Sequence, residues 1–178
     1  KWYKPAADQG MPRAQCNLGF CYYQGIGVET DDKTAVEWFQ KAAQEGFPRA
    51  MNLLGCCYRD GDGVERDTAQ AVAWFQRAVD LGHPPALVSL GLCYEHGEGV
   101  EQDIPRAVEL YCQAGESGDP AGACNAGYCY LTGAGVPQDF AQAVSWLERA
   151  AGRDYPRALD LLGDCCHYGD GVPQDDRR

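Results

Sequence analysis

The stretch CNLGFCYYQGIGV, residues 16–28, returns in four near-copies along the chain. The copies are NLLGCCYRDGDGV at 52–64, VSLGLCYEHGEGV at 88–100, CNAGYCYLTGAGV at 124–136 and DLLGDCCHYGDGV at 160–172. Each copy begins 36 residues after the one before it. A fixed internal period of this length predicts a repeat protein, in which neighbouring units stack to form one continuous core.

The first half of each unit predicts one helix. When a unit is numbered from its first alanine, apolar or small side chains fall at places one, five, eight and nine, which lie on one face of a helix. In the second unit these are Ala50, Leu54, Cys57 and Tyr58. The G-x-G-V stretch predicts the end of this helix, because glycine favours the left-handed conformation found at helix C-termini.

The second half of each unit predicts another helix, which begins after an aspartate. An aspartate ahead of an apolar periodic run is typical of a helix N-cap, where its carboxylate accepts backbone N–H groups. The five aspartates are Asp31, Asp67, Asp103, Asp139 and Asp175. The four tryptophans belong to this second helix, and we expect them to be structural: Trp2, Trp38, Trp74 and Trp146.

The units therefore predict one all-α solenoid over residues 1–178. It comprises complete helix-loop-helix repeats at 14–49, 50–85, 86–121 and 122–157, with a partial leading repeat at 1–13 and a partial trailing repeat at 158–178. The chain begins without methionine and in the middle of a repeat, so we expect it to be part of something longer.

The full pattern A-x-x-x-L-G-x-x-Y-x-x-G-x-G-V-x-x-D-x-x-x-A-V-x-W-x-x-x-A-A-x-x-G resembles the Sel-1-like repeat, a relative of the tetratricopeptide repeat. The resemblance covers essentially the whole chain. It implies a right-handed α/α superhelix whose concave wall is lined by first helices. It also implies an adaptor that gathers other proteins, and such proteins are not usually enzymes.

Charge and hydropathy limit the classes of partner and the cellular location that we expect. A net charge of −11 argues against nucleic acid and against an anionic membrane surface, because both bind positive faces. No apolar stretch approaches the roughly 18 residues of a membrane span, and no signal peptide opens the chain. A cytoplasmic location is the prediction, with a secreted or periplasmic location as the alternative.

One cysteine recurs two residues after the first glycine of every copy, as Cys21, Cys57, Cys93, Cys129 and Cys165. Equivalent residues of stacked helices lie about 9 to 10 Å apart, whereas a disulfide needs Cα atoms closer than about 7 Å. We therefore interpret this thiol as a small, buried packing residue.

Five further cysteines are irregular, namely Cys16, Cys56, Cys112, Cys124 and Cys166. The resemblance to cysteine-rich relatives implies disulfides that staple neighbouring helices, with about seven residues between the partners. Cys112 and Cys124 are the nearest analogue, but eleven residues separate them. Free thiols are the preferred interpretation, and a secreted, disulfide-stapled protein is the alternative.

No residue pattern predicts catalysis, a cofactor or a metal. Adjacent cysteines such as Cys56 and Cys57 point about 100° apart on a helix, and C-x-x-C spacing is absent. The three histidines occupy different places in the unit, so they form no repeated acid–base device. The G-x-G-V loops follow helices rather than strands and lack the lysine of a phosphate-binding loop.

The predicted functional surface is the concave groove. Places three, seven, ten and eleven vary between copies, and apolar or aromatic side chains such as Leu92 favour an interaction surface. The predicted partner-binding residues are Phe20, Tyr23, Asn52, Cys56, Arg59, Val88, Leu92, Glu95, His96, Tyr128, Leu131 and Asp164. Arg13, Arg49 and Arg157 precede a unit and either supply carboxylate or phosphate contacts along the rim or only solvate the surface.

Two classes of function remain. The first is an interaction scaffold that binds a peptide or protein in the groove. The alternative is an assembly module, whose uncapped ends stack on another copy or on further repeats. The secreted, disulfide-stapled protein is a variant of the first class.

Overall fold

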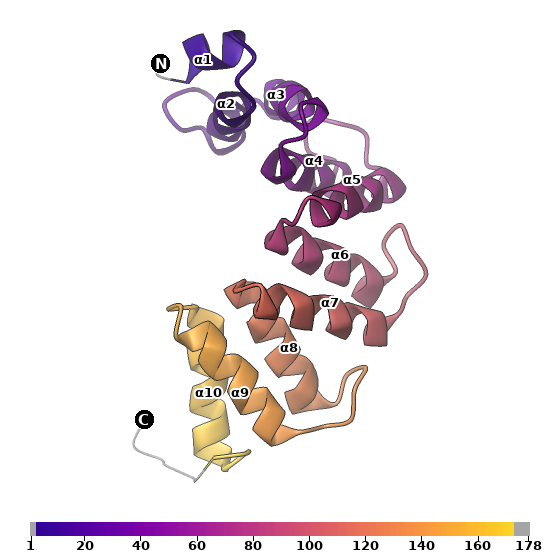
Figure 1. Ribbon diagram of the computed structural model, residues 1–178, viewed down its shortest axis with the longest axis vertical. Helices are drawn as coiled ribbons and strands as arrows, with labels where there is room; N and C mark the ends of the chain where they lie inside the picture. Colours follow the sequence, from indigo (N-terminus) through magenta and orange to yellow (C-terminus); the bar gives the residue numbers. More distant parts are fainter. Residues whose placement is uncertain (1–2, 173–178) are drawn as a thin grey trace. The chain divides into compact units, whose positions relative to one another are not determined.

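The computed structural model describes residues 3–172, and this part of the chain is entirely helical, with no strand (Figure 1). The helices are α1 (Lys4–Asp8), α2 (Pro12–Gln24), α3 (Asp32–Gln44), α4 (Pro48–Asp60), α5 (Thr68–Asp80), α6 (Pro84–His96), α7 (Ile104–Glu116), α8 (Pro120–Thr132), α9 (Phe140–Ala151) and α10 (Pro156–Tyr168). We call the even-numbered helices first helices, and α3, α5, α7 and α9 second helices. The prediction of an all-α protein built from helix-loop-helix repeats is confirmed.

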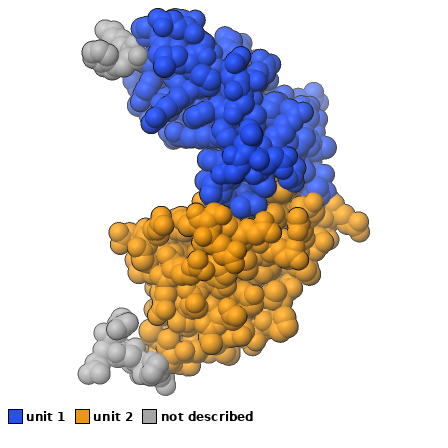
Figure 2. All heavy atoms as spheres, in the orientation of Figure 1, with its two compact units in different colours: residues 1–89, 98–100 blue, residues 90–97, 101–178 orange. Residues whose placement is uncertain are grey.

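The chain divides into two compact units (Figure 2). Unit 1 comprises residues 1–89 and 98–100, and unit 2 comprises residues 90–97 and 101–178. The division falls within α6, so the first part of this helix belongs to unit 1 and its last part to unit 2.

The predicted aspartate N-caps of the second helices are confirmed by their hydrogen bonds. Four aspartates cap second helices, and each accepts the backbone N–H three residues further on at 2.9 to 3.0 Å: Asp31, Asp67, Asp103 and Asp139. Asp175 and Trp2 lie outside the described residues. Each first helix begins at a proline, two residues before the first residue of the numbered repeat, which is alanine except for Gly122. Proline fits there because the first turn needs no N–H from it.

The fourth repeat departs from the pattern where its second helix ends. Gly46, Gly82 and Gly118 have positive φ at this place, and Asp154 takes the same conformation with φ 55°. Asp154 therefore replaces the glycine itself. Aspartate tolerates the left-handed region better than most residues, because its short side chain can hydrogen-bond locally.

Within a repeat, a glycine of the first helix lies directly against a side chain of the second helix. A Cβ placed on Gly55 would lie 2.5 Å from the Phe75 ring, and one on Gly91 would lie 2.5 Å from the Tyr111 ring. Gly19 faces Phe39 in the same way, and Gly127 faces Leu147. Phe75 and Tyr111 are buried as a result. The missing side chain is what lets the two helices approach closely enough to bury these residues.

The recurring cysteines lie in this close-packed region. Cys57, Cys93, Cys129 and Cys165 are buried, and Cys21 is half-buried. The burial agrees with the packing interpretation at four of the five places. No disulfide joins the ten cysteines, all of which lie among the described residues.

Successive repeats meet where the loop of one approaches the start of the preceding second helix. A Cβ on Gly63 would lie 2.3 Å from the carbonyl oxygen of Asp32, and one on Gly99 would lie 2.2 Å from that of Thr68. In unit 2, Gly171 lies against the Phe140 carbonyl in the same way. Because the obstacle is backbone, it cannot rotate away as a side chain can.

We predict that Gly63→Ala destabilises the protein more than Gly27→Ala does. Both glycines have a left-handed φ, 72° and 71°, so both alanines carry a backbone cost of about 1 kcal/mol. Only Gly63 meets a neighbour, because Gly27 has open space around its Cβ position. The overlap adds roughly 1 to 3 kcal/mol to the loss of unfolding free energy in Gly63→Ala. Urea unfolding followed by circular dichroism measures the difference, and equal losses in the two variants would contradict it.

Candidate partner-binding surface

The twelve predicted groove residues all come from first helices, and none is fully buried. On unit 1 they form a first-helix surface of half-buried side chains: Phe20, Tyr23, Asn52, Cys56, Arg59 and Val88. On unit 2 Leu92, Glu95 and Leu131 are half-buried, and the exposed members are His96, Tyr128 and Asp164. Two first-helix surfaces, one on each unit, therefore carry the predicted residues.

Two residues at place three do not face outward as the sequence analysis expected. Cys16 and Cys124 are both fully buried. Burial raises the pKa of Cys16 to about 11, and a neighbouring guanidinium, that of Arg49, partly opposes this rise. Arg157 opposes the rise at Cys124 in the same way. In both repeats, an arginine from the next first helix lies close to the thiol.

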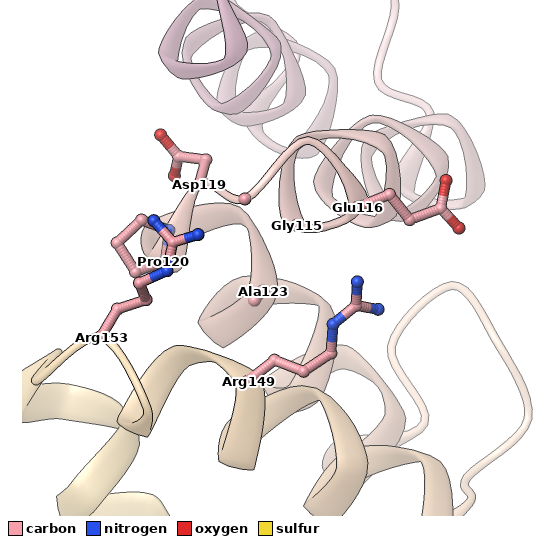
Figure 3. Close-up of a pocket in the computed structure, with 8 residues that line it drawn as sticks. Gly115, Glu116, Asp119, Pro120, Ala123, Arg149 and Arg153 are labelled. Atoms are coloured by element: carbon pink, nitrogen blue, oxygen red, sulfur yellow. The ribbon is translucent and has the colours of Figure 1, made fainter.

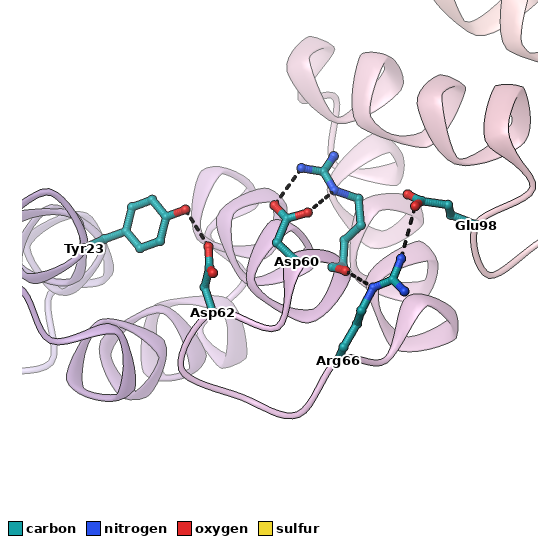
Figure 4. A network of polar contacts seen from close by, with 6 residues as sticks. Tyr23, Asp60, Asp62, Arg66 and Glu98 are labelled. Atoms are coloured by element: carbon teal, nitrogen blue, oxygen red, sulfur yellow. Dashed lines mark hydrogen bonds and ion pairs between the residues drawn. The ribbon is translucent and has the colours of Figure 1, made fainter.

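Tyr23 and Arg59 are held by a polar network in unit 1 (Figure 4). The Tyr23 hydroxyl donates to the Asp62 carboxylate at 2.8 Å, which links α2 to the loop after α4 and raises the pKa of Tyr23. Arg59 donates to both carboxylate oxygens of Asp60 at 2.8 Å. Arg66 donates to the Arg59 carbonyl at 2.7 Å and to Glu98 at 3.1 Å. These contacts fix the loops, so Tyr23 and Arg59 have a structural role.

Glu95 is also engaged within unit 2. It accepts a hydrogen bond from the hydroxyl of Tyr111, whose ring is buried against Gly91. Burial first, and then this hydrogen bond, raise the pKa of Tyr111. Glu95 thus satisfies a hydroxyl that is otherwise shielded from water, which a buried polar group requires.

Asn52 carries a polar atom without a partner. Its Oδ1 is shielded from solvent and accepts no hydrogen bond among the described residues. A ligand N–H at this point on the unit 1 surface would satisfy it.

Phe20 of unit 1 lies beneath an arginine. The Arg49 guanidinium, from the first turn of α4, lies 5.4 Å from the centroid of the Phe20 ring on α2. Arg49 Nη1 also donates to Asn17 Oδ1 at 3.4 Å. We call Asn17, Phe20 and Arg49 clasp 1.

The same arrangement recurs in unit 2. The Arg157 guanidinium, from the first turn of α10, lies 5.3 Å from the centroid of the Tyr128 ring on α8. Arg157 Nη1 donates to Asn125 Oδ1 at 2.9 Å. We call Asn125, Tyr128 and Arg157 clasp 2. Arg13, the third predicted rim arginine, is exposed and has no stacked ring among the described residues.

Sequence reasoning missed the two asparagines. Asn17 and Asn125 stand at place four of the first and fourth complete units, and no other described copy has asparagine there. Those are also the two complete repeats that end in arginine and that have an aromatic residue at place seven. The joint occurrence of asparagine, an aromatic residue and arginine in the same two repeats is the signal from which the contact could have been predicted.

A surface pocket of about 280 Å³ lies apart from the first-helix residues named above, at the C-terminal ends of α7 and α9 in unit 2 (Figure 3). Arg149 and Arg153 line it together with Glu116 and Asp119. Asp119 already caps α8 by accepting the Gly122 N–H at 2.9 Å. Two positive and two negative side chains leave the pocket with no net charge.

Two searches of the described residues gave negative results. No group of three or more His, Cys, Asp or Glu side chains in residues 3–172 is placed to hold a metal ion. No helix in that part of the chain has the length and apolar character needed to cross a membrane.

Helical hairpins at a 36-residue period, with recurrent residues inside and variable residues on the first-helix surfaces, define an α/α repeat protein. The Sel1 repeat family model matches residues 1–11, 12–47, 48–83, 84–119, 120–155 and 156–178, and the chain therefore belongs to the Sel1 repeat family. The predicted resemblance is confirmed. From residue 12 onward, each matched segment begins two residues before the corresponding repeat as predicted from the sequence. Sel1 repeat proteins are in general protein-interaction scaffolds rather than enzymes.

Three solved structures illustrate the similarity. A Sel1 repeat protein from Oxalobacter formigenes is 32% identical with a TM-score of 0.92, over 99% of this chain and 70% of that one. A protective antigen of uropathogenic Escherichia coli, c5321, is 37% identical with a TM-score of 0.84, over 98% of this chain and 37% of that one. Cysteine-rich protein B of Helicobacter pylori is 25% identical with a TM-score of 0.59, over 71% of this chain and 96% of that one. No curated protein matched the chain.

We predict that the buried thiols make the protein less stable at alkaline pH. Burial raises the pKa of Cys57 from 9.0 to about 12, so above pH 9 the unfolded state loses a proton that the folded state keeps. This contribution is fully present below pH 9 and disappears as the pH rises toward 12. For one such thiol, the unfolding free energy falls by up to about 1.4 kcal/mol per pH unit.

Urea unfolding at several pH values, for wild type and Cys57→Ala, tests this expectation. Both proteins carry the same remaining ionisable side chains, so the difference between the two pH curves reports the contribution of the Cys57 thiol. We expect a shallower alkaline decline in Cys57→Ala. Parallel curves would show that the Cys57 thiol does not contribute.

Proposed function

We propose that this chain is an interaction scaffold whose first-helix surfaces bind an extended peptide or another protein. The observation that supports the proposal is the division of each repeat into invariant and variable places. Most of the glycines and cysteines that recur within first helices are buried, as Gly55 and Cys57 are. The twelve variable residues are all half-buried or exposed and all lie on first helices.

The apolar content of these surfaces favours binding over simple solvation. Tyr128 is 40% exposed, and Phe20 and Leu92 are half-buried on the same helical face. Aromatic and aliphatic side chains that stay partly exposed among polar neighbours commonly form the energetic centre of an interface. The residue at place seven differs in each repeat. Each repeat therefore offers a different side chain to a bound partner.

A second candidate function is end-to-end assembly, and α10 supports it. Gly163 has open space where the equivalent glycines face a second-helix side chain. Leu159 is 51% exposed on the same helix, and Tyr168 is 70% exposed. A second helix from another copy or from further repeats would cover this face. Light scattering across a range of concentrations separates the candidates, because stacking of copies makes the mass grow with concentration.

The cytoplasm is the location that we propose, with a secreted or periplasmic location as the alternative. The ten cysteines are free thiols, six of them buried, which is compatible with a reducing compartment. The similarity to a cysteine-rich Helicobacter pylori protein supports the alternative. Counting reactive thiols in denatured protein taken directly from its source cells distinguishes the two.

We predict that Phe20→Ala/Leu92→Ala/Tyr128→Ala loses the natural partner while keeping the fold. These side chains are only partly buried, so truncation removes contact area without opening a deep cavity. Quantitative affinity capture from the source lysate compares this variant with wild type, after circular dichroism has shown that both are helical. We expect at least about tenfold less captured partner, which corresponds to the loss of one binding hot spot.

A control removes exposed apolar side chains away from the first-helix surfaces. Ile26 lies in a loop and is 57% exposed, and Leu81 follows α5 and is 52% exposed. The variant Ile26→Ala/Leu81→Ala should capture as much partner as wild type. Loss in the control together with retention in the triple variant would place the binding surface elsewhere.

A further inference from the structure

Clasps 1 and 2 are two copies of one arrangement. In each, an arginine from one first helix lies over an aromatic ring of the preceding first helix and donates to an asparagine one turn away on that helix. The copies are 108 residues apart, which is three repeat periods, and each unit holds one. At the positions that are equivalent to the clasp arginines, the two intervening first helices have Pro85 and Ala121, so they carry no such arginine.

Each clasp arginine keeps most of its hydrogen-bonding capacity. A guanidinium has five N–H donors, and one of them is engaged by the asparagine. Within residues 3–172, no ion pair joins Arg49 or Arg157 to a carboxylate, whereas Arg59, Arg66 and Arg106 each have one. Arg49 and Arg157 share this lack of an ion pair with Arg77 and Arg149, and they differ from those two in the hydrogen bond to asparagine.

Each clasp also restricts the position of the positively charged guanidinium group. Stacking on the ring and the hydrogen bond to asparagine restrict a side chain that otherwise has many rotamers, so less entropy is lost when a ligand binds. The planar fork of donors then matches the two oxygens of a carboxylate. The ring beside it offers apolar contact to the rest of the bound residue.

From this arrangement we propose that each clasp binds a side-chain or terminal carboxylate of an acidic peptide segment. The proposal rests on the proposed function, since it names the chemistry of the partner. Charge complementarity supports a carboxylate, because one fixed guanidinium balances one negative charge. A phosphate group carries almost twice that charge and is usually bound by several cationic groups together.

The test measures binding of a fluorescein-labelled peptide of alternating glutamate and leucine by fluorescence anisotropy. A second peptide with glutamine in place of glutamate, and a third with phosphoserine, serve as comparisons. The clasp variant is Arg49→Gln/Arg157→Gln. The matched control is Arg77→Gln/Arg149→Gln, which removes two arginines that stack on Trp74 and Trp146 at 4.7 and 4.6 Å on second helices, again one in each unit.

We expect wild type to prefer the glutamate peptide to the glutamine peptide. The clasp variant should bind the glutamate peptide at least about tenfold more weakly, as the loss of a charge-assisted hydrogen bond implies. The control should bind as wild type does, although its net charge changes equally. Arg49→Lys/Arg157→Lys should recover only part of the affinity, because lysine keeps the charge but not the fork.

Several outcomes would overturn the proposal. Equal weakening in the clasp and control variants would show a general effect of charge. Equal binding of the glutamate and glutamine peptides, tighter binding of the phosphoserine peptide with the same loss in the clasp variant, or no binding of the glutamate peptide by wild type at about 1 mM would each exclude a carboxylate site.

Affinity capture separates this proposal from the proposed function. If the natural partner is lost from Phe20→Ala/Leu92→Ala/Tyr128→Ala but kept by Arg49→Gln/Arg157→Gln, the scaffold function stands and the carboxylate clasp is wrong. If both variants keep the partner, both proposals fail.

Discussion

The close contact between a glycine of the first helix and a large side chain of the second holds each complete repeat together. Phe39, Phe75, Tyr111 and Leu147 occupy the space that a side chain on the glycine would fill. Close approach of the helices also leaves little volume two residues further along the first helix, where the cysteine recurs. The glycine and the thiol therefore express one packing constraint, since both must be small where the helices are nearest.

Much of the fold could be predicted because its determinants are local. The period, the aspartate caps and the glycine helix ends each depend on a few neighbouring residues, and the structure has them at the expected places. Burial of Cys16 and Cys124 could not be predicted in this way. It depends on packing between helices: Cys16 lies in a core cluster with Phe39 of the second helix and Ala50 of the next first helix.

The candidate surface was predicted only in outline for the same reason. Which first-helix residues lie outward follows from periodicity, whereas their hydrogen bonds depend on how neighbouring elements meet. Tyr23 is bound by Asp62 of the next repeat, and Glu95 by Tyr111 of its own second helix. The Asn17–Arg49 contact joins residues 32 positions apart. Such contacts give several predicted binding residues a structural role as well, and they position Asn17, which the sequence analysis left out.

The contact between each inter-helix loop and the preceding second helix constrains the length of that loop. A loop glycine such as Gly63 fits against the start of the second helix before it, whereas Gly27 has open space around its Cβ position. An insertion in one of these loops would move its glycine off the neighbouring backbone and break the junction between repeats. Loop length is therefore set by the neighbour rather than by the loop itself. This explains why all five copies keep one spacing, although short surface loops usually tolerate changes in length.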